Sequence, residues 1–170
     1  MIGFAMQIAE GMAYLEEKHY IHRDLRTENI LLTEMMSCKI ADFGLSKLLK
    51  NKSYRLSHDA KVPIKWMAPE IFTDNIYTTK SDVWSFGILL MEIIAYGKEP
   101  FPDDDNTNYV KALIEGSHIT PPAGCPDDLG NIMLQCWKQK SEERPTFNQL
   151  QDRLMACNPI VDTEEILSSA

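Results

Sequence analysis

Cysteine is scarce in this 170-residue sequence, and its four copies, Cys38, Cys125, Cys136 and Cys157, include no C-x-x-C pair. Zinc-binding modules usually need ligands at such close spacing, so the cysteines argue against one. Wide spacing also favours reduced thiols over a disulfide framework, which is the state expected in the cytosol. We therefore expect a cytoplasmic protein, with any membrane association depending on upstream sequence outside this chain.

Positive charge is also in deficit, because 17 Lys and Arg residues stand against 25 Asp and Glu residues, a formal charge of −8. Nucleic-acid binding depends on clustered Lys and Arg, so no nucleic-acid partner is expected. Long hydrophobic runs are lacking too. The most apolar run, 83–95, is interrupted by Ser85, Gly87 and Glu92 and is too short to cross a bilayer, so it predicts a buried helix.

Hydrophobic periodicity predicts a chain that is mainly helical. Apolar residues recur at helical spacing from Phe4 to Leu15, so the chain begins inside an amphipathic helix. Further helices are expected over residues 80–96, 109–115, 129–138 and 147–155.

The pattern around these helices predicts their ends and a small amount of strand. Ser81 is the expected N-cap of the helix over 80–96, and Gly97 is expected to stop it. Short apolar runs at 29–32 and 38–41 predict a small hairpin, so the expected total is one or two short strands. Residues 44–65 are polar and irregular, which predicts a functional loop.

Three side chains, Asp24, Asn29 and Asp42, form a set that suits phosphoryl transfer. This reaction needs an oriented acceptor hydroxyl and metal ions that neutralise the phosphate charge. A carboxylate at Asp24 can accept the hydroxyl proton. The amide oxygen of Asn29 and the carboxylate of Asp42 are hard oxygen ligands of the kind that Mg²⁺ prefers.

The local strings around this set carry a family resemblance. H-R-D-L-x-x-x-N occupies 22–29, D-F-G occupies 42–44 and A-P-E occupies 68–70, in the order of the kinase signature. The chain therefore resembles the C-terminal lobe of eukaryotic protein kinases over residues 1–157, with 158–170 as a C-terminal tail. The resemblance implies a mainly α, kinase-like fold with a small β-hairpin beside the catalytic loop.

The resemblance also assigns roles to individual residues. Asp24 is expected to be the catalytic base, with Arg26 and Asn29 acting in the same loop. Asp82 is expected to brace this loop from the central helix. The expected ligand contacts are Leu31, Ala41 and Asp42 for ATP, and Asn29 and Asp42 for Mg²⁺. The expected structural residues are His22, Phe43, Asp82 and the ion pair of Glu70 with Arg144.

The segment before A-P-E resembles the tyrosine-kinase form of the substrate platform, with Pro63, Lys65 and Trp66 as the expected platform residues. Proline and tryptophan can make a flat apolar shelf on which a phenol ring lies, whereas a serine side chain would not reach Asp24. The implied partners are proteins phosphorylated on tyrosine.

The catalytic loop is similar to the L-R-A-A-N loop of Src-family cytoplasmic kinases, because Arg26 follows the base by two residues. Two features depart from that family. Glu28 replaces a small residue and adds negative charge beside the phosphate, and residues 158–170 lack a tyrosine, so tail regulation is not implied. Tyr54 is the expected activation-loop phosphorylation site, with Arg23 as the partner of its phosphate.

Glycine is too sparse to supply a phosphate grip, since no spacing among the eight glycines gives G-x-G-x-x-G and nothing before His22 resembles V-A-I-K. We therefore expect the N-terminal lobe to be absent from this chain and to be a missing partner, along with upstream regulatory domains. Two hypotheses remain open. The chain is either part of a tyrosine kinase, inactive alone, or a non-catalytic docking module.

Overall fold

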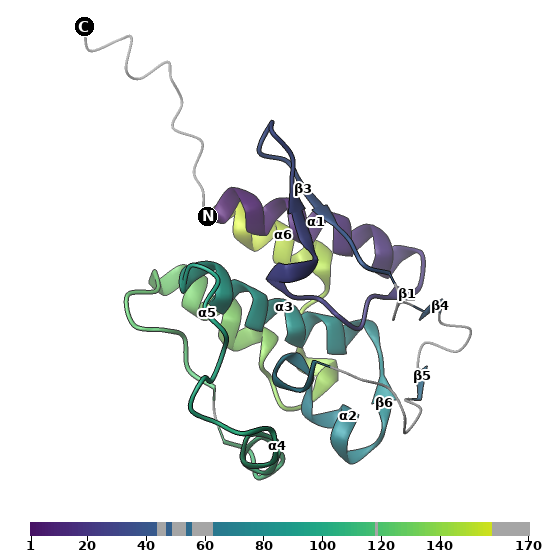
Figure 1. Ribbon diagram of the computed structural model, residues 1–170. Helices are drawn as coiled ribbons and strands as arrows, with labels where there is room; N and C mark the ends of the chain where they lie inside the picture. Colours follow the sequence, from purple (N-terminus) through teal and green to yellow (C-terminus); the bar gives the residue numbers. More distant parts are fainter. Residues whose placement is uncertain (44–46, 49–53, 56–62, 118, 158–170) are drawn as a thin grey trace, which may run out of the picture.

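The computed structural model describes residues 1–43, 47–48, 54–55, 63–117 and 119–157, and helices are its main elements (Figure 1). The prediction of a mainly helical chain is confirmed. The helices are α1 (Ile2–Glu17), α2 (Pro69–Thr73), α3 (Thr79–Ile94), α4 (Asn106–Ile114), α5 (Asp127–Cys136) and α6 (Phe147–Ala156), with short 3-10 turns η1 (Thr27–Asn29), η2 (Ile64–Trp66) and η3 (Ser141–Glu143).

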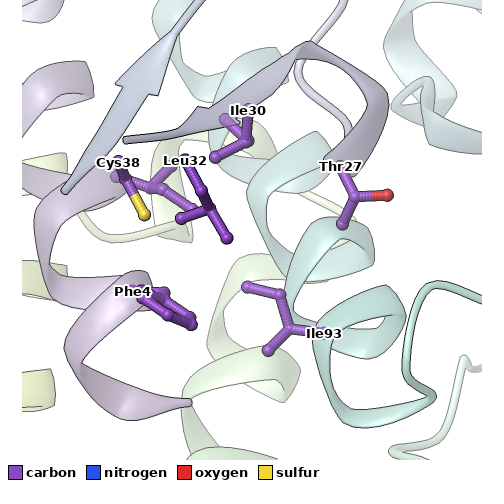
Figure 2. A pocket seen from close by; sticks show the side chains of 7 residues that line it. Phe4, Thr27, Ile30, Leu32, Cys38 and Ile93 are labelled. Carbon is purple, nitrogen blue, oxygen red and sulfur yellow. The ribbon is translucent and has the colours of Figure 1, made fainter. Parts of the chain in front are cut away.

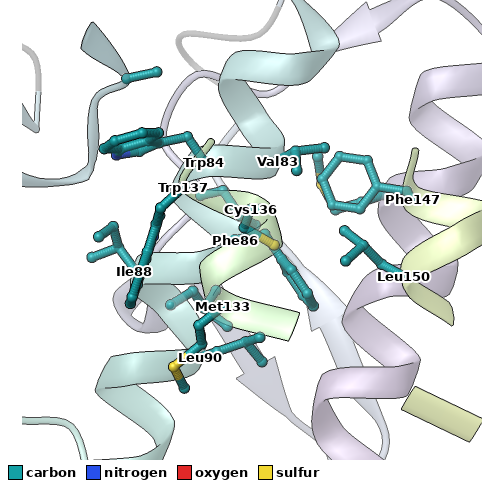
Figure 3. Packing of buried hydrophobic residues seen from close by; sticks show 14 of the residues in the cluster. Val83, Trp84, Phe86, Ile88, Leu90, Met133, Cys136, Trp137, Phe147 and Leu150 are labelled. Carbon is teal, nitrogen blue, oxygen red and sulfur yellow. The ribbon is translucent and has the colours of Figure 1, made fainter. Parts of the chain in front are cut away.

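Helix α3 passes through the core, and its twelve residues from Ser81 to Glu92 are all buried. An element surrounded by protein must be apolar on nearly every face, which explains the predicted pattern over 80–96. Figure 3 shows α3 side chains packed against α5, Trp137 and α6, and the rings of Phe86 and Phe147 meet edge to face with centroids 5.7 Å apart. Helix α1 packs along α6 (Figure 1).

The ends of α3 differ from the predicted ones. Thr78, in extended backbone, is the N-cap, and it exchanges hydrogen bonds with Ser81 as a capping box. The prediction of Ser81 as N-cap is therefore wrong, because its hydroxyl acts from the third helical position. The helix ends at Ile94, and the N–H of Gly97, at φ +79°, bonds the carbonyl of Glu92 at 2.8 Å.

Two other helices, α4 and α5, also differ from their predicted bounds. Helix α4 begins three residues earlier than predicted, at Asn106, because the carboxylate of Asp105 accepts a hydrogen bond from the backbone N–H of Asn108 (2.8 Å). Helix α5 begins at Asp127 directly after Pro126, which is its N-cap residue, and ends two residues before the predicted end. Helix α6 begins at the predicted residue.

The described strands form three antiparallel pairs, so the prediction of one or two strands is wrong. The pair predicted from the sequence is the hairpin of β2 with β3. Strands of two residues are too short to show alternation, which explains why the other two pairs gave no signal. The pairs are β2 (Ile30–Leu32) with β3 (Cys38–Ile40), β1 (Tyr20–Ile21) with β4 (Lys47–Leu48), and β5 (Tyr54–Arg55) with β6 (Ile76–Tyr77).

Several predictions fall on residues that the structure does not describe. Of the loop predicted over 44–65, only 47–48, 54–55 and 63–65 are described, and Gly44 of the D-F-G string and the whole tail 158–170 lie outside. None of the described helices combines the length and the apolarity that crossing a membrane requires.

An apolar pocket of about 140 Å³ lies between α1, the β2–β3 hairpin and α3 (Figure 2). Its walls come from Phe4 and Ile8 on α1, from the hairpin, and from Ile93 at the end of α3. Thr27, three residues after Asp24, also lines the pocket.

Packing around Gly87 generates a first prediction. A methyl group added there would lie 2.5 Å from Nε1 of Trp137 and 2.8 Å from Cβ of Cys136. We expect Gly87→Ala to lower the free energy of unfolding by about 1–3 kcal/mol, because a well-packed core resists an extra methyl group. Urea unfolding measures the change.

Gly3→Ala is the matched control, since Gly3 also lies in a helix and nothing stands within 4 Å of an added methyl group. This variant should be as stable as the parent or slightly more stable. Equal losses in the two variants would contradict the packing at Gly87.

Candidate active site

The loop after β1, which carries Asp24, is anchored from the first turn of α3 by the buried carboxylate of Asp82. Its two oxygens accept hydrogen bonds from consecutive backbone N–H groups, those of His22 (2.7 Å) and Arg23 (2.9 Å). Arg23 has a φ of +72°, an unfavourable conformation that these bonds help to hold. Burial raises the pKa of Asp82 to about 7, and the two N–H donors oppose that rise.

The imidazole of His22 connects this loop to the segment that carries Asp42. Its Nδ1 accepts from the backbone N–H of Asp24 (3.3 Å), so Nε2 carries the proton and donates to the carbonyl of Ala41 (3.0 Å). Burial lowers the pKa of His22, which keeps this neutral form. The ring of Phe43 lies edge-on to His22, with centroids 5.3 Å apart.

Asn29 and Asp42 lie on neighbouring backbone segments. The amide of Asn29 donates to the carbonyl of Asp24 (2.7 Å), and the backbone carbonyl of Asn29 accepts from the N–H of Ala41 (2.8 Å). Asp42 is exposed, with φ +58°. No three His, Cys, Asp or Glu side chains gather as a metal site in the described part of the chain. Two oxygen donors nevertheless fit Mg²⁺, which is commonly held by one or two protein ligands and phosphate oxygens.

Arg26 lies between two carboxylates. Its Nε is 3.1 Å from Oδ1 of Asp24, an ion pair without hydrogen-bond alignment, and its Nη2 is 2.7 Å from Oε2 of Glu28. The guanidinium also stacks over the indole of Trp66, 5.4 Å from the ring centroid. Arg26 therefore joins Asp24 to the predicted substrate platform, and Glu28 directs its carboxylate to Arg26.

Glu92, near the end of α3, is a site residue that sequence reasoning missed. Its buried carboxylate accepts from the N–H (3.1 Å) and hydroxyl (2.7 Å) of Thr27 and from the indole N–H of Trp66 (2.9 Å). One side chain thus fixes the loop that carries Asp24 against the predicted platform. The available signal was a lone glutamate inside an apolar helix, since a buried charge needs partners.

The platform residues predicted from the sequence, Pro63, Lys65 and Trp66, lie at or within η2. The ammonium of Lys65 is buried, where it donates to the carbonyl of Phe101 (2.7 Å) and pairs with Glu99 (3.1 Å). We call Asp24, Arg26, Pro63, Lys65 and Trp66 the acceptor site, after the role predicted for them from the sequence.

The structure also brings Glu70 and Arg144 together as a bidentate pair with distances of 2.7 and 2.8 Å. The Arg144 guanidinium is fully buried, donates to three backbone carbonyls and stacks on Trp84 at 5.0 Å. Ser81 donates its hydroxyl to the same Glu70 carboxylate (2.9 Å). The pair therefore ties α2 to the chain just before α6.

The remaining predicted residues lie at the edges of the site. Leu31, on β2, exposes 56% of its surface, and Ala41 follows β3. Tyr54 pairs through its backbone with Tyr77 of β6, but its side chain lies outside the described residues. Arg23 stacks over the Tyr77 ring, with its guanidinium 5.8 Å from the ring centroid.

Comparison with known protein families gives a match over most of the chain. The model of a family described as protein tyrosine and serine/threonine kinase matches residues 1–154. The matched span includes every residue of the site described above.

The buried His22 generates a pH prediction. Its pKa is lowered by burial, so below pH 6.5 the unfolded chain binds a proton that the folded chain does not. This contribution to the free energy of unfolding is complete above pH 6.5 and is lost as the pH falls towards the lower pKa of the folded state. His22 should therefore lower the free energy of unfolding at pH 5.5 relative to pH 7.5, and His22→Gln should remove this loss. Urea unfolding at pH 7.5 and 5.5 measures the difference.

Comparison of two variants isolates the effect. Asp82 changes stability with pH in the opposite direction. Its pKa is raised in the folded chain, so its contribution to the free energy of unfolding is lost as the pH rises from 3.8 to about 7. This contribution is the same in every variant that retains Asp82 and cancels when two such variants are compared. His19→Gln, at an exposed residue, is the control. The same pH dependence in both variants would contradict the role of burial at His22.

Proposed function

The chain belongs to the protein tyrosine and serine/threonine kinase family, and from this membership we propose that it is the C-terminal lobe of a tyrosine kinase similar to the Src-family cytoplasmic enzymes. Family membership makes the chain part of a protein kinase, a transferase that acts on proteins. The observation that carries the finer proposal is the position of Asp24, whose carboxylate is paired with an arginine that stacks on Trp66.

Asp24 is the proposed base. The acceptor hydroxyl gives its proton to this carboxylate as the oxygen attacks phosphorus. Two hydrogen bonds fix the backbone of Asp24 and so the position of its carboxylate. The backbone N–H of Asp24 donates to the ring of His22, and its carbonyl accepts from the side-chain amide of Asn29. When bound, Mg²⁺-ATP supplies the transferred phosphoryl group and neutralises its charge. Asn29 and Asp42 would hold the metal, and Leu31 and Ala41 would contact the nucleotide.

Two features support tyrosine as the acceptor. Trp66 is only partly buried and is fixed at both ends, by Glu92 at the indole N–H and by Arg26 over the ring. With Pro63 it offers a rigid apolar surface next to Asp24. A phenol ring can lie on such a surface and bring its hydroxyl to the carboxylate, whereas a serine hydroxyl on its short side chain stays farther away.

The proposed regulation involves Tyr54 and Arg23. The backbone of Tyr54 pairs with Tyr77, and Arg23 stacks on the ring of that residue. A phosphate on Tyr54 would pair with the guanidinium of Arg23. The backbone N–H of the same arginine is bonded to Asp82. Phosphorylation would then stabilise the loop that carries Asp24.

An upper lobe is the proposed partner for nucleotide binding. The 170 residues contain no glycine-rich phosphate loop, and two large apolar side chains near the site, Leu31 and Phe43, are at least half exposed. A nucleotide-binding lobe would cover them. We assign the C-terminal lobe to residues 1–157 and a tail to residues 158–170, and we propose that the protein is cytoplasmic.

Loss of the base tests the catalytic role. We expect residues 1–170 alone to transfer no measurable phosphate from Mg²⁺-ATP, and the chain joined to a kinase nucleotide-binding lobe to be active. In the joined protein Asp24→Asn should lower kcat by about two to four decades. Phosphate transfer to a tyrosine peptide is the measurement. If the joined Asp24→Asn variant turns over like its parent, the role of Asp24 is contradicted. If residues 1–170 alone transfer more phosphate than their own Asp24→Asn control, the upper lobe is dispensable.

Acceptor choice is a separate prediction. The joined protein should phosphorylate tyrosine peptides and leave peptides with serine at the same position unmodified, because only the longer side chain spans the shelf and reaches Asp24. Rates on the two peptides are compared at equal concentration. Equal rates would reject tyrosine specificity and leave kinase activity itself intact.

A further inference from the structure

Both cations of the acceptor site are paired with carboxylates that reach further into solvent. Arg26 lies 2.7 Å from Glu28, and Lys65 lies 3.1 Å from Glu99. The side chains of Arg26 and Lys65 are 27% and 10% exposed. Those of Glu28 and Glu99 are 70% and 62% exposed. At both places the positive charge lies inside and the negative charge faces outwards.

Further contacts hold the two cations in place. Arg26 stacks on Trp66 and pairs with Asp24, and Lys65 donates to the carbonyl of Phe101 at 2.7 Å. Turning either cation towards a bound peptide would break these contacts. Glu28 and Glu99 are each held by one ion pair, and most of each side chain is in solvent, where a second cation can approach it.

Additional negative charge borders the same surface. The turn after Phe101, which contacts Lys65, carries the exposed residues Asp103 and Asp104. Asp104 lines a pocket together with Tyr109, whose hydroxyl bonds the carbonyl of Lys65 at 3.0 Å. We call Glu28, Glu99, Asp103 and Asp104 the acidic rim. The rim lies on two sides of the platform, one next to Arg26 and the other next to Lys65.

We propose that this site selects protein segments with Lys or Arg close to the acceptor residue. The inference rests on the proposed function, since it concerns what the acceptor site binds. A basic side chain beside the acceptor meets Glu28 or Glu99 at the surface, whereas an acidic one meets like charge and finds Arg26 and Lys65 already paired. Each exposed ion pair is expected to change affinity roughly threefold.

The chain itself supplies a probe of this composition. Residues 50–58 read K-N-K-S-Y-R-L-S-H, a tyrosine flanked by three basic residues. The matched control peptide, E-N-E-S-Y-E-L-S-H, replaces those three residues with Glu. Each peptide is titrated at low ionic strength into the ¹⁵N-labelled chain, and binding is followed by NMR at the indole N–H of Trp66 and the amide of Thr27, which both bond Glu92. Site-resolved signals separate binding here from attraction to the net charge of −8.

Two double variants test the rim. Glu28→Gln with Glu99→Gln removes its two paired carboxylates and should weaken binding of the basic peptide about three- to tenfold. Glu115→Gln with Glu143→Gln changes the net charge equally at two other exposed carboxylates, each near a lysine, and should leave binding within about twofold.

The outcomes separate this proposal from the proposed function. The charge preference is supported if the basic peptide binds at Trp66 and Thr27 at least about tenfold more tightly than the acidic peptide, and if only the rim variant weakens that binding. Equal binding of both peptides, or equal effects of both double variants, overturns the charge preference and leaves the acceptor site standing. If neither peptide shifts these two signals, the acceptor site is wrongly assigned, and the proposed function and this inference both fail.

Discussion

The buried carboxylate of Asp82 accepts hydrogen bonds from two consecutive backbone N–H groups, and the arrangement of the site depends on this contact. Because the bonds run to backbone, they fix the conformation of His22 and Arg23 whatever their side chains do. With that backbone fixed, the His22 ring reaches Asp24 on one side and Ala41 on the other. The two segments with the proposed catalytic and metal-binding groups are therefore positioned by one side chain of a core helix.

Charged side chains at the site are also held by a small number of specific partners. Glu92, Arg144, Arg26 and Lys65 are buried or half-buried, and each has an opposite charge or several hydrogen bonds close by, as a low-dielectric setting requires. Glu92 has three donors, and Arg144 has a carboxylate and three carbonyls. Arg26 and Lys65 follow the same rule with partners at the surface. Pairing that stabilises the folded chain thus also sets which charges an incoming protein segment meets.

The sequence was a good guide where chemistry depends on residue type at short spacing. Asp24, Asn29 and Asp42 were singled out by their strings, and the hairpin at β2–β3 and the buried helix α3 followed from hydrophobic pattern. Contacts between distant residues were not predictable in the same way. Lys65 was predicted as a platform residue, but the pairing of its ammonium with Glu99, 34 residues later, could not be read from the sequence. Glu92 looked like an interruption of an apolar run, because its partners on two loops are invisible in a linear pattern.

Helix α3 holds the site at two points, Asp82 in its first turn and Glu92 in its last. Glu92 follows Asp82 by ten residues of α-helix, which places the anchor of the loop that carries Asp24 about 15 Å along the helix axis from the anchor of the predicted platform. A change in the length of this segment would alter the relative positions of the two anchors. One inserted residue would shift Glu92 by about 1.5 Å and rotate it by about 100° relative to Asp82. The number of residues between these two acids is therefore constrained by the site, in addition to the packing that constrains their side chains.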